Sequence, residues 1–312
     1  MLVAALTGCG DSTSGPEVPT SFHLDTIASG FDRPVAVQRD PQGLLLALQA
    51  GLVVRTNGSI VHDFRGQVPA DLNLVGGLLN FLVVGTRHFV FLTTGDNDHT
   101  LVAEILGARL DTLMLTADLK VEHHGGGLAW YQGRLIAAIG EGDSGTGRGP
   151  GVAGKVLSID PSTRRIDILA SGLRNPWRIA LAGDSLWITD AGDRLSEEVN
   201  VLDLRTPGAD FGWGISEGTT CTAASCAGVR WPVFTYPTGS GCSTVVGAAW
   251  YEGRLWFADY CQRWVSALDR SGIATCVFDL TDDIISISPS DDGGPFILTA
   301  DGDVLRIVAD FE

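Results

Sequence analysis

The stretch YQGRLIAAIGEGD, residues 131–143, shows the pattern that decides the fold. A short apolar run at 134–139 follows a Gln-Gly pair and ends at a second glycine-rich turn. Glycine beside a polar residue, placed between two apolar runs, is typical of the tight turn of a β-hairpin. The stretch therefore predicts two antiparallel strands, one on each side of Gly133.

The same unit recurs along the chain at 41–61, 182–193, 251–261 and 292–308, whereas helix signals are nearly absent. A spacing of about 40 to 50 residues is the period of a four-stranded propeller blade. The sequence therefore predicts an all-β, six-bladed β-propeller, an arrangement favoured over a pair of β-sandwiches, which predicts no such regular spacing. The expected blades are 33–64, 77–119, 124–170, 175–205, 243–280 and 283–307. Residues 22–30 are expected to add a strand to the last blade and close the ring.

Composition narrows the classes of function. The chain has 312 residues, of which 45% are hydrophobic and 19% charged, and its formal net charge is −16. Hydrophobic content at this level supports a large folded core. A surface this acidic repels phosphate backbones, so nucleic acid is excluded as an expected partner.

The N-terminus resembles an export signal. Leu6, Thr7, Gly8 and Cys9 form a lipobox-like sequence, in which the cysteine thiol takes a lipid, and a Ser/Gly/Pro/Thr tether follows. The apolar run before Cys9 is short for a signal peptide, so a longer leader is expected upstream. We expect residues 1–20 to be a signal remnant and tether and 21–312 to be the propeller, in an exported lipoprotein that meets the membrane only through Cys9.

Cysteine use agrees with export. Cys221 and Cys226 lie close together in one loop, and Cys242 and Cys261 flank one predicted hairpin, so each pair is expected to form a disulfide. Cys276 is left over and is expected to be buried in a strand. No CxxC or HxxxH spacing exists, which argues against a zinc site.

Three short segments carry candidate functional residues. His123 precedes a glycine run, and histidine is the natural general base near neutral pH. Arg174 and Asn175 stand before a strand that begins at Pro176, where together they can clamp a carboxylate or carbonyl oxygen. An acidic turn is a possible Ca²⁺ site, and it contains Asp190, Asp193, Glu197 and Glu198. Each segment also has a structural reading, as a loop histidine, an ion pair beside a core tryptophan, and a solvated turn.

The order of motifs is informative. The chain carries HHGGGL at 123–128, GKVLSID at 154–160, GLRNPWR at 172–178, EEVN at 197–200 and FADYC at 257–261. This series resembles the glucose/sorbosone dehydrogenase family, the soluble quinoprotein sugar dehydrogenases, over roughly 30–308. The resemblance implies a six-bladed propeller that holds pyrroloquinoline quinone (PQQ) with Ca²⁺ at the channel mouth. Such an enzyme oxidises an aldose sugar at C1 to the lactone and passes the electrons to an external acceptor.

The resemblance also implies roles for individual residues. His123 would be the base that takes the proton from the anomeric hydroxyl. Arg174 and Asn175 would contact the quinone oxygens of PQQ. The backbone carbonyls of Gly192 and Asp193 would bind Ca²⁺.

The sequence departs from the family pattern on the cofactor side. A lysine of the family is replaced within DYCQRW at 259–264, and two arginines that hold the PQQ carboxylates are replaced by Asp282 and Asp283. Either other arginines, such as Arg148, Arg178 or Arg263, hold the carboxylates instead, or the cofactor is weakly held or absent. Two alternative functions stay open: a catalytically degenerate propeller that binds a sugar or a protein, and a metal-dependent lactonase built on Glu141, Asn175 and Asp190.

Overall fold

The computed structural model describes residues 19–70, 72, 76–116, 122–142, 144–238 and 241–311. The expected lipid-bearing Cys9 and most of the expected tether lie outside these residues. Across the described ranges every helix-or-strand element is a strand, and none of it forms a helix long and apolar enough to cross a membrane.

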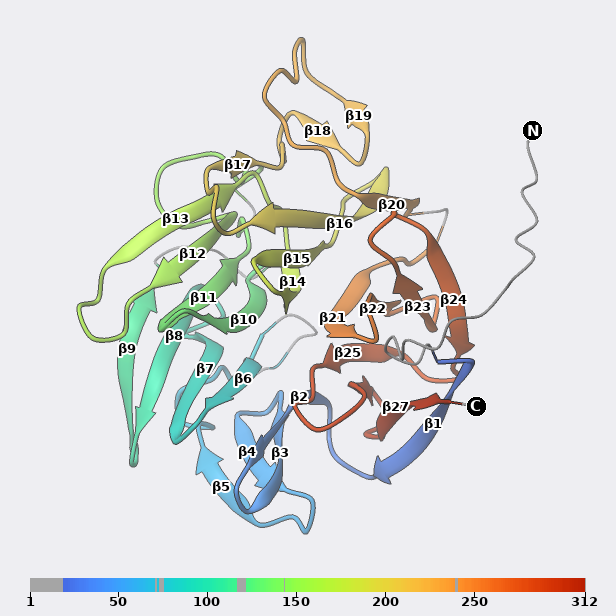
Figure 1. The fold of residues 1–312 in the computed structure, drawn as a ribbon. Coiled ribbons are helices and arrows are strands. Elements are labelled where there is room, and N and C mark those ends of the chain that lie inside the picture. Colours follow the sequence, from blue (N-terminus) through green and yellow to red (C-terminus); the bar gives the residue numbers. More distant parts are fainter. Residues whose placement is uncertain are drawn as a thin grey trace.

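Six sheets of four or five strands are arranged as blades around a central axis (Figure 1), which confirms the predicted six-bladed propeller. The first three blades contain, from the inner strand outward, β2 (Pro34–Asp40), β3 (Gly43–Leu48), β4 (Leu52–Arg55) and β5 (Ile60–Asp63); β6 (Leu78–Val84), β7 (Arg87–Thr94), β8 (His99–Leu106) and β9 (Arg109–Leu115); and β10 (Gly125–Tyr131), β11 (Arg134–Ile139), β12 (Lys155–Ile159) and β13 (Ile166–Ser171).

The other three blades contain β14 (Pro176–Ala182), β15 (Ser185–Asp190), β16 (Ser196–Asp203) and β20 (Phe234–Pro237); β21 (Val245–Tyr251), β22 (Arg254–Asp259), β23 (Trp264–Leu268) and β24 (Ala274–Asp279); and β25 (Ile284–Ser288), β26 (Phe296–Thr299), β27 (Val304–Asp310) and β1 (Ser21–Ala28). The apolar side chains between neighbouring blades are buried. They include Leu45 and Leu78 between blades 1 and 2, and Ile136 and Ile188 between blades 3 and 4.

The ring closes where the sequence predicts. Strand β1 pairs antiparallel with β27 in the sixth blade, from Ser21 opposite Asp310 to Ala28 opposite Val304. The first described strand thus becomes the outer strand of the last blade, and the two ends of the described chain lie close together (Figure 1). Pairing of the ends removes a free sheet edge from the ring.

The repeated hairpin turns have the geometry that their sequences require. Gln132 and Gly133 both have positive φ, 47° and 81°, and so do Glu252 and Gly253, with 48° and 72°. Positive φ at both central residues defines the type I′ turn, whose twist matches that of the flanking strands. The polar-Gly pairs therefore fix the first hairpin of blades 3 and 5.

The fourth blade differs from the expectation. Its predicted range, 175–205, contains only three strands, and the outer strand β20 follows a long excursion. Within the excursion, β17 (Ala209–Asp210) adds in parallel to β13 of the third blade. The excursion also forms the projecting hairpin of β18 (Ser216–Glu217) and β19 (Thr220–Cys221) (Figure 1). Two-residue strands carry too little periodicity for a sequence pattern to reveal them.

The predicted cysteine pairing is confirmed, but the predicted burial of Cys276 is not. Disulfides join Cys221 to Cys226 and Cys242 to Cys261. Cys276 lies in β24, as expected of a strand residue, but its side chain is exposed. It sits on the outer strand of blade 5, where no further strand covers it, so the prediction of a buried thiol is wrong.

All six inner strands carry an irregularity near their start. In five of them the second residue drops out of regular pairing, whereas in β21 Val246 stays paired with Ala258 and the register shifts between Val246 and Ala249. A β-bulge of this kind leaves the extra residue unpaired and turns its backbone away from the ladder. The second residues are Val35, Leu79, Gly126, Trp177, Val246 and Ile285.

Arg178 lies at the propeller axis and donates hydrogen bonds to the backbone carbonyls of three of these second residues. Its guanidinium donates to the carbonyls of Val35, Leu79 and Trp177 at 2.7–2.9 Å and to the Ser286 hydroxyl at 2.8 Å. A Cβ on Gly126 would lie 2.9 Å from the same guanidinium, so the third blade must have glycine there. Arg178 therefore ties blades 1, 2, 4 and 6 together and is only 4% exposed.

We predict that Arg178→Met destabilises the protein strongly. Met has a similar length but donates no hydrogen bond, so it leaves buried carbonyls without a donor, at about 1–3 kcal/mol for each group. The free energy of unfolding, measured by urea titration with circular dichroism, is expected to fall by about 3 kcal/mol or more. Arg165→Met, at a side chain that is 72% exposed, is the control and is expected to change it by less than about 0.5 kcal/mol. Equal losses in the two variants would refute the role given to Arg178.

Candidate functional site

Arg178 lies between two cavities of the central channel. The cavity at the end where the inner strands begin, called here the N-side cavity, has a volume of about 250 Å³. The cavity at the end where they finish, the C-side cavity, has a volume of about 380 Å³. The two cavities share no described lining residue, and the Arg178 layer lies between them. The two ends of the channel are therefore separate candidates for a site.

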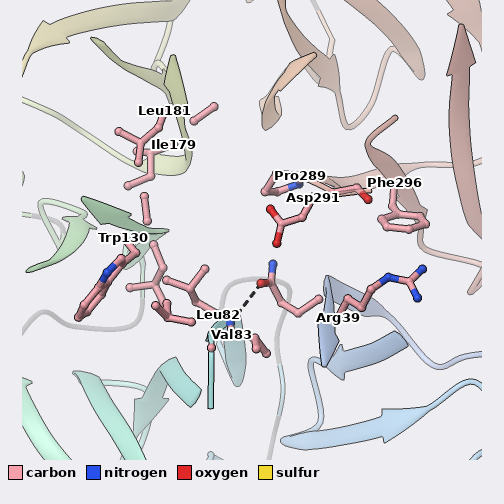
Figure 2. Close-up of a pocket in the computed structure, with 16 residues that line it drawn as sticks. Arg39, Leu82, Val83, Trp130, Ile179, Leu181, Pro289, Asp291 and Phe296 are labelled. Atoms are coloured by element: carbon pink, nitrogen blue, oxygen red, sulfur yellow. Dashed lines mark hydrogen bonds between the residues drawn. The ribbon is translucent and has the colours of Figure 1, made fainter. Parts of the chain in front are cut away.

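The C-side cavity contains none of the predicted site residues. Figure 2 shows Leu82, Trp130, Ile179 and Leu181 on one side of it and Pro289, Asp291, Phe296 and Arg39 on the other. The Val83 N–H of β6 donates a hydrogen bond of 3.1 Å to the side-chain oxygen of Gln38, which lies in the inner strand β2 of the first blade (Figure 2). This end carries apolar walls and a few surface charges, and no histidine lines it.

The N-side cavity is lined by the bulged residues and by loops between blades. Five of the six second residues of the inner strands reach it, and Trp177 spans the channel to donate to the Ile285 carbonyl at 2.9 Å. Polar side chains of the loops complete the lining. They belong to Arg33, Gln49, Asn175, Thr244 and Tyr260.

His123 lies in the loop before the inner strand β10, at the same end of the propeller. Its Nδ1 is 3.1 Å from Oε1 of Glu141, and its side chain is 16% exposed. Its φ of 52° is unusual for a residue other than glycine. Strained backbone of this kind costs on the order of 1–3 kcal/mol and concentrates at functional sites.

Glu141 defines the tautomer of His123. Burial opposes ionisation of this carboxyl group, but hydrogen bonds from His123 and Ser144 outweigh it and lower the pKa below its usual value. Glu141 is therefore ionised at neutral pH and accepts the proton carried by Nδ1 of His123. That leaves Nε2 of His123 as the nitrogen that can accept a proton from a ligand.

The structure brings the predicted residues of three loops together. Oδ1 of Asn175 accepts the Gly125 N–H at 3.0 Å, and the Arg174 carbonyl accepts the Glu141 N–H at 2.8 Å. These bonds join the loops that carry His123, Glu141 and Asn175. Because Asn175 uses its oxygen on the backbone and lines the N-side cavity, its amide nitrogen is the end that can donate to a ligand.

The neighbouring histidine has a different environment. His124 is 2% exposed, and its Nδ1 is 2.9 Å from the Thr100 hydroxyl. Burial lowers the pKa of His124 to about 4. It is a neutral core histidine at pH 7, and the candidate base is His123.

Backbone N–H groups of the protein donate hydrogen bonds to the buried carboxylates of the acidic turn. Asp190 accepts the N–H groups of Arg174 and Asn175, and Glu197 accepts those of Gly192 and Val245. Glu198 accepts the Gly218 N–H and the Asn200 amide. These carboxylates hold loops in place, which supports the structural reading of the turn over a calcium site.

A residue that sequence reasoning missed closes the same turn. Oε1 of Glu217, in the excursion of blade 4, accepts four consecutive N–H groups, from Asp193 to Ser196, at 2.8–3.2 Å. A carboxylate therefore fills the anion-binding concavity that this loop forms. No local motif links Glu217 to residues more than twenty positions earlier, so the sequence carries no signal for it.

Burial dominates the electrostatics of this turn. It raises the pKa of Asp190 to about 6 and that of Glu197 to about 7, against the hydrogen bonds that each accepts. It also raises the pKa of Glu198 to about 8, and repulsion from Asp190, which lies opposite on the paired strand, adds to the effect.

The residues expected to bind Ca²⁺ do not fit a calcium site. The Gly192 carbonyl already accepts a hydrogen bond of 2.6 Å from the Arg174 guanidinium, which also donates to the Ala191 carbonyl and to Asp193. Within the part of the chain that the structure describes, no three His, Cys, Asp or Glu side chains gather closely enough to hold a metal ion.

The donor set of the N-side cavity does fit an anionic quinone. Arg33 and Asn175 line it, no acidic residue is among its described lining residues, and Trp177 and aliphatic side chains form its walls. Outside this lining, Nε of Arg174 and Nε1 of Trp213 are buried without a hydrogen-bond partner among the described residues. Unused donors in a buried position are costly unless a ligand accepts from them.

The compensating cations are not the ones expected. Arg178 is the axial tie described above, Arg148 pairs with Asp210 at 2.6 Å, and Arg263 pairs with Asp283 at 2.8 Å. The last pair offsets one of the two aspartates that replace the family's arginines. Arg33, to which no sequence motif pointed, is the arginine among the described lining residues of the cavity.

Comparison with solved structures places the fold. PQQ-bound aldose sugar dehydrogenase from Streptomyces coelicolor superposes with a TM-score of 0.76 at 18% identity, over 93% of this chain and 99% of that one. The soluble aldose sugar dehydrogenase from Escherichia coli, in its apo form, gives 0.74 at 19% identity, over 93% and 100%. A carbohydrate-active enzyme of family AA12 from Trichoderma reesei, solved as a calcium structure, gives 0.64 at 11%, over 96% and 99%.

No family model and no curated protein matches the sequence. At these identities the likeness establishes the fold. The chain has the six-bladed propeller architecture that soluble sugar dehydrogenases use, in agreement with the resemblance of its motifs.

We predict that stability falls as pH rises from 6.5 to 8.5. Glu197 and Glu198 have raised pKa values of about 7 and about 8 in the folded state, against about 4.3 unfolded. The folded chain therefore binds more protons in this window and loses that advantage as they dissociate. Melting temperatures should fall by several degrees, and Glu198→Gln should flatten the slope while Glu252→Gln, at an exposed position, should not. A slope unchanged by Glu198→Gln would show that this carboxyl group does not titrate there.

Proposed function

We propose that this protein is a quinone-dependent sugar dehydrogenase that oxidises an aldose at C1 to the lactone. The observation that carries the proposal is the His123–Glu141 pair at the N-side of the propeller. The pair is not among the described lining residues of the N-side cavity, but the hydrogen bond from the Gly125 N–H to Asn175 joins its loop to the cavity wall, which Asn175 and Arg33 line. The fold shared with sugar dehydrogenases and the order of the sequence motifs support it.

His123 acts as the general base. Its Nδ1 proton is held by Glu141, so Nε2 takes the proton of the anomeric hydroxyl while C1 loses a hydride. Loss of one proton and one hydride converts the C1 alcohol into a lactone carbonyl. The nearby Glu141 carboxylate stabilises the imidazolium that forms.

PQQ is the cofactor that suits the cavity, and when bound it supplies a quinone that accepts the hydride. The amide nitrogen of Asn175 and the guanidinium of Arg33 would hold it from the cavity wall, with Arg174 beside the quinone oxygens. Cationic donors aimed at these oxygens stabilise the negative charge that grows on them. The electrons then leave to an external acceptor, such as a redox dye or a one-electron carrier.

Neither alternative function is favoured by the site. A lactonase metal held by Glu141, Asn175 and Asp190 would need free oxygens, and each of these residues already accepts a hydrogen bond. A degenerate binding propeller has no need for a strained histidine paired with a buried carboxylate.

Export and lipid attachment belong to the same proposal. The two disulfides favour an oxidising compartment. We propose that the protein is an exported, cell-surface or periplasmic lipoprotein whose lipid is carried by Cys9. Mass spectrometry of the membrane fraction, with Cys9→Ser as the control, tests this: a diacylglycerol mass on the wild type only is the expected result.

We predict that His123→Ala abolishes most of the activity. The protein is incubated with PQQ, and dye reduction is followed with a panel of aldoses. Loss of a general base should lower kcat by about 10² to 10⁴ and leave the far-UV spectrum unchanged. His99→Ala, a histidine paired with Asp98 on blade 2, is the matched control and should retain full activity. Undiminished turnover in His123→Ala would rule out this residue as the base.

A further inference from the structure

The position at which the family resemblance expects calcium is occupied by a side chain of this protein. Nη1 of Arg174 lies 2.6 Å from the Gly192 carbonyl oxygen and 3.2 Å from that of Ala191. Nη2 lies 3.3 Å from Oδ1 of Asp193. The guanidinium therefore engages the Gly192 carbonyl, one of the two that the resemblance assigns to Ca²⁺, together with the neighbouring Ala191 carbonyl.

The guanidinium is held in this position by its surroundings. The Arg174 side chain is 14% exposed, and its Cζ lies 5.3 Å from the centre of the Trp213 ring. The backbone N–H of the same residue is bound by Asp190 at 3.0 Å. Arginine stacked on an aromatic ring and anchored at its backbone keeps its charge and has little freedom to move away.

Arg174 competes with calcium for the Gly192 carbonyl. The ion requires six to eight oxygen ligands at about 2.3–2.6 Å, and the Gly192 oxygen is already engaged by a cation. The carboxylates that could complete a shell are themselves bound to backbone: Glu197 accepts the Gly192 N–H, and Glu217 closes the loop after it. A second positive charge beside the guanidinium would also be repelled at contact distance.

We propose that Arg174 is a built-in cation that takes the place of Ca²⁺ at the cofactor site of this protein. The inference rests on the proposed quinone-dependent function and deepens it. Arg174 supplies the positive charge beside the quinone oxygens, and Nε of Arg174, buried with no partner among the described residues, is a donor left for the ligand. Cofactor binding then needs no divalent metal.

Calcium binding without cofactor tests the inference directly. The protein is stripped with EGTA, and Ca²⁺ alone is titrated by calorimetry and by melting temperature. Wild type is expected to bind no Ca²⁺, whereas Arg174→Ala, which frees the Gly192 and Ala191 carbonyls, should bind one ion and melt several degrees higher with it. Arg148→Ala, which removes another paired arginine, should behave as wild type. If Arg174→Ala does not fold, Arg174→Gln keeps an amide donor without the charge and serves instead.

Two outcomes overturn the inference. Wild type that binds Ca²⁺ as tightly as the Arg174 variant shows that the guanidinium excludes nothing. A variant that binds none shows that this loop is no cation position.

PQQ binding, followed by quenching of tryptophan fluorescence, separates this inference from the proposed function. Equal affinity in EGTA and in 1 mM Ca²⁺, within about twofold, supports a built-in cation, and affinity at least tenfold weaker in EGTA contradicts it. In Arg174→Ala, binding in EGTA should be lost and Ca²⁺ should restore it. Absence of PQQ binding in both buffers would remove the proposed function, and the calcium titration would still decide whether Arg174 excludes the ion.

Discussion

The structure depends on how the backbone is satisfied around the propeller axis. Five of the six inner strands have their register broken at the second residue, and in three of them the carbonyl of that residue accepts a hydrogen bond from Arg178 on the axis. Buried carbonyls without donors would be costly. Arg178 donates hydrogen bonds to three of these carbonyls and to the Ser286 hydroxyl. Burial of its guanidinium opposes the positive charge and lowers the pKa of Arg178 to about 9. One cation thus sets the spacing of four blades and separates the N-side cavity from the C-side cavity.

Hydrogen bonds between buried side chains and backbone groups also hold the candidate site on the N-side in place. Asp190 holds the N–H groups of Arg174 and Asn175, Asn175 holds that of Gly125, and Glu217 holds the loop that begins at Asp193. Buried carboxylates therefore fix the side chains that would meet a ligand. A site supported in this way is positioned before any ligand arrives, and this preorganisation is what a positively charged contact to a quinone oxygen requires.

The sequence predicted the fold more completely than the site. Glycine turns and short apolar runs repeat with the blade period, so the number of blades, the closing strand and both disulfides followed from local patterns. The excursion in blade 4 did not, because β17, β18 and β19 are two residues long each and β17 pairs with the distant strand β13. Exposure of Cys276 depends on which strand is outermost. The axial place of Arg178 and the cavity place of Arg33 depend on contacts between blades, which no local pattern records.

The charges around the cavity make a fixed cation a coherent replacement for a metal. The protein carries a net charge of −16, so its surface would attract Ca²⁺ without giving it a specific site. A guanidinium anchored at its backbone brings its charge with the fold and cannot be removed by dilution or chelation. Its single charge is partly offset by Asp193, so it polarises a quinone oxygen less than a divalent ion does. In the proposed site the cation on Arg33, on the cavity wall, would complement it: Arg174 would lie beside the quinone oxygens, and Arg33 would meet the carboxylates of the same ligand.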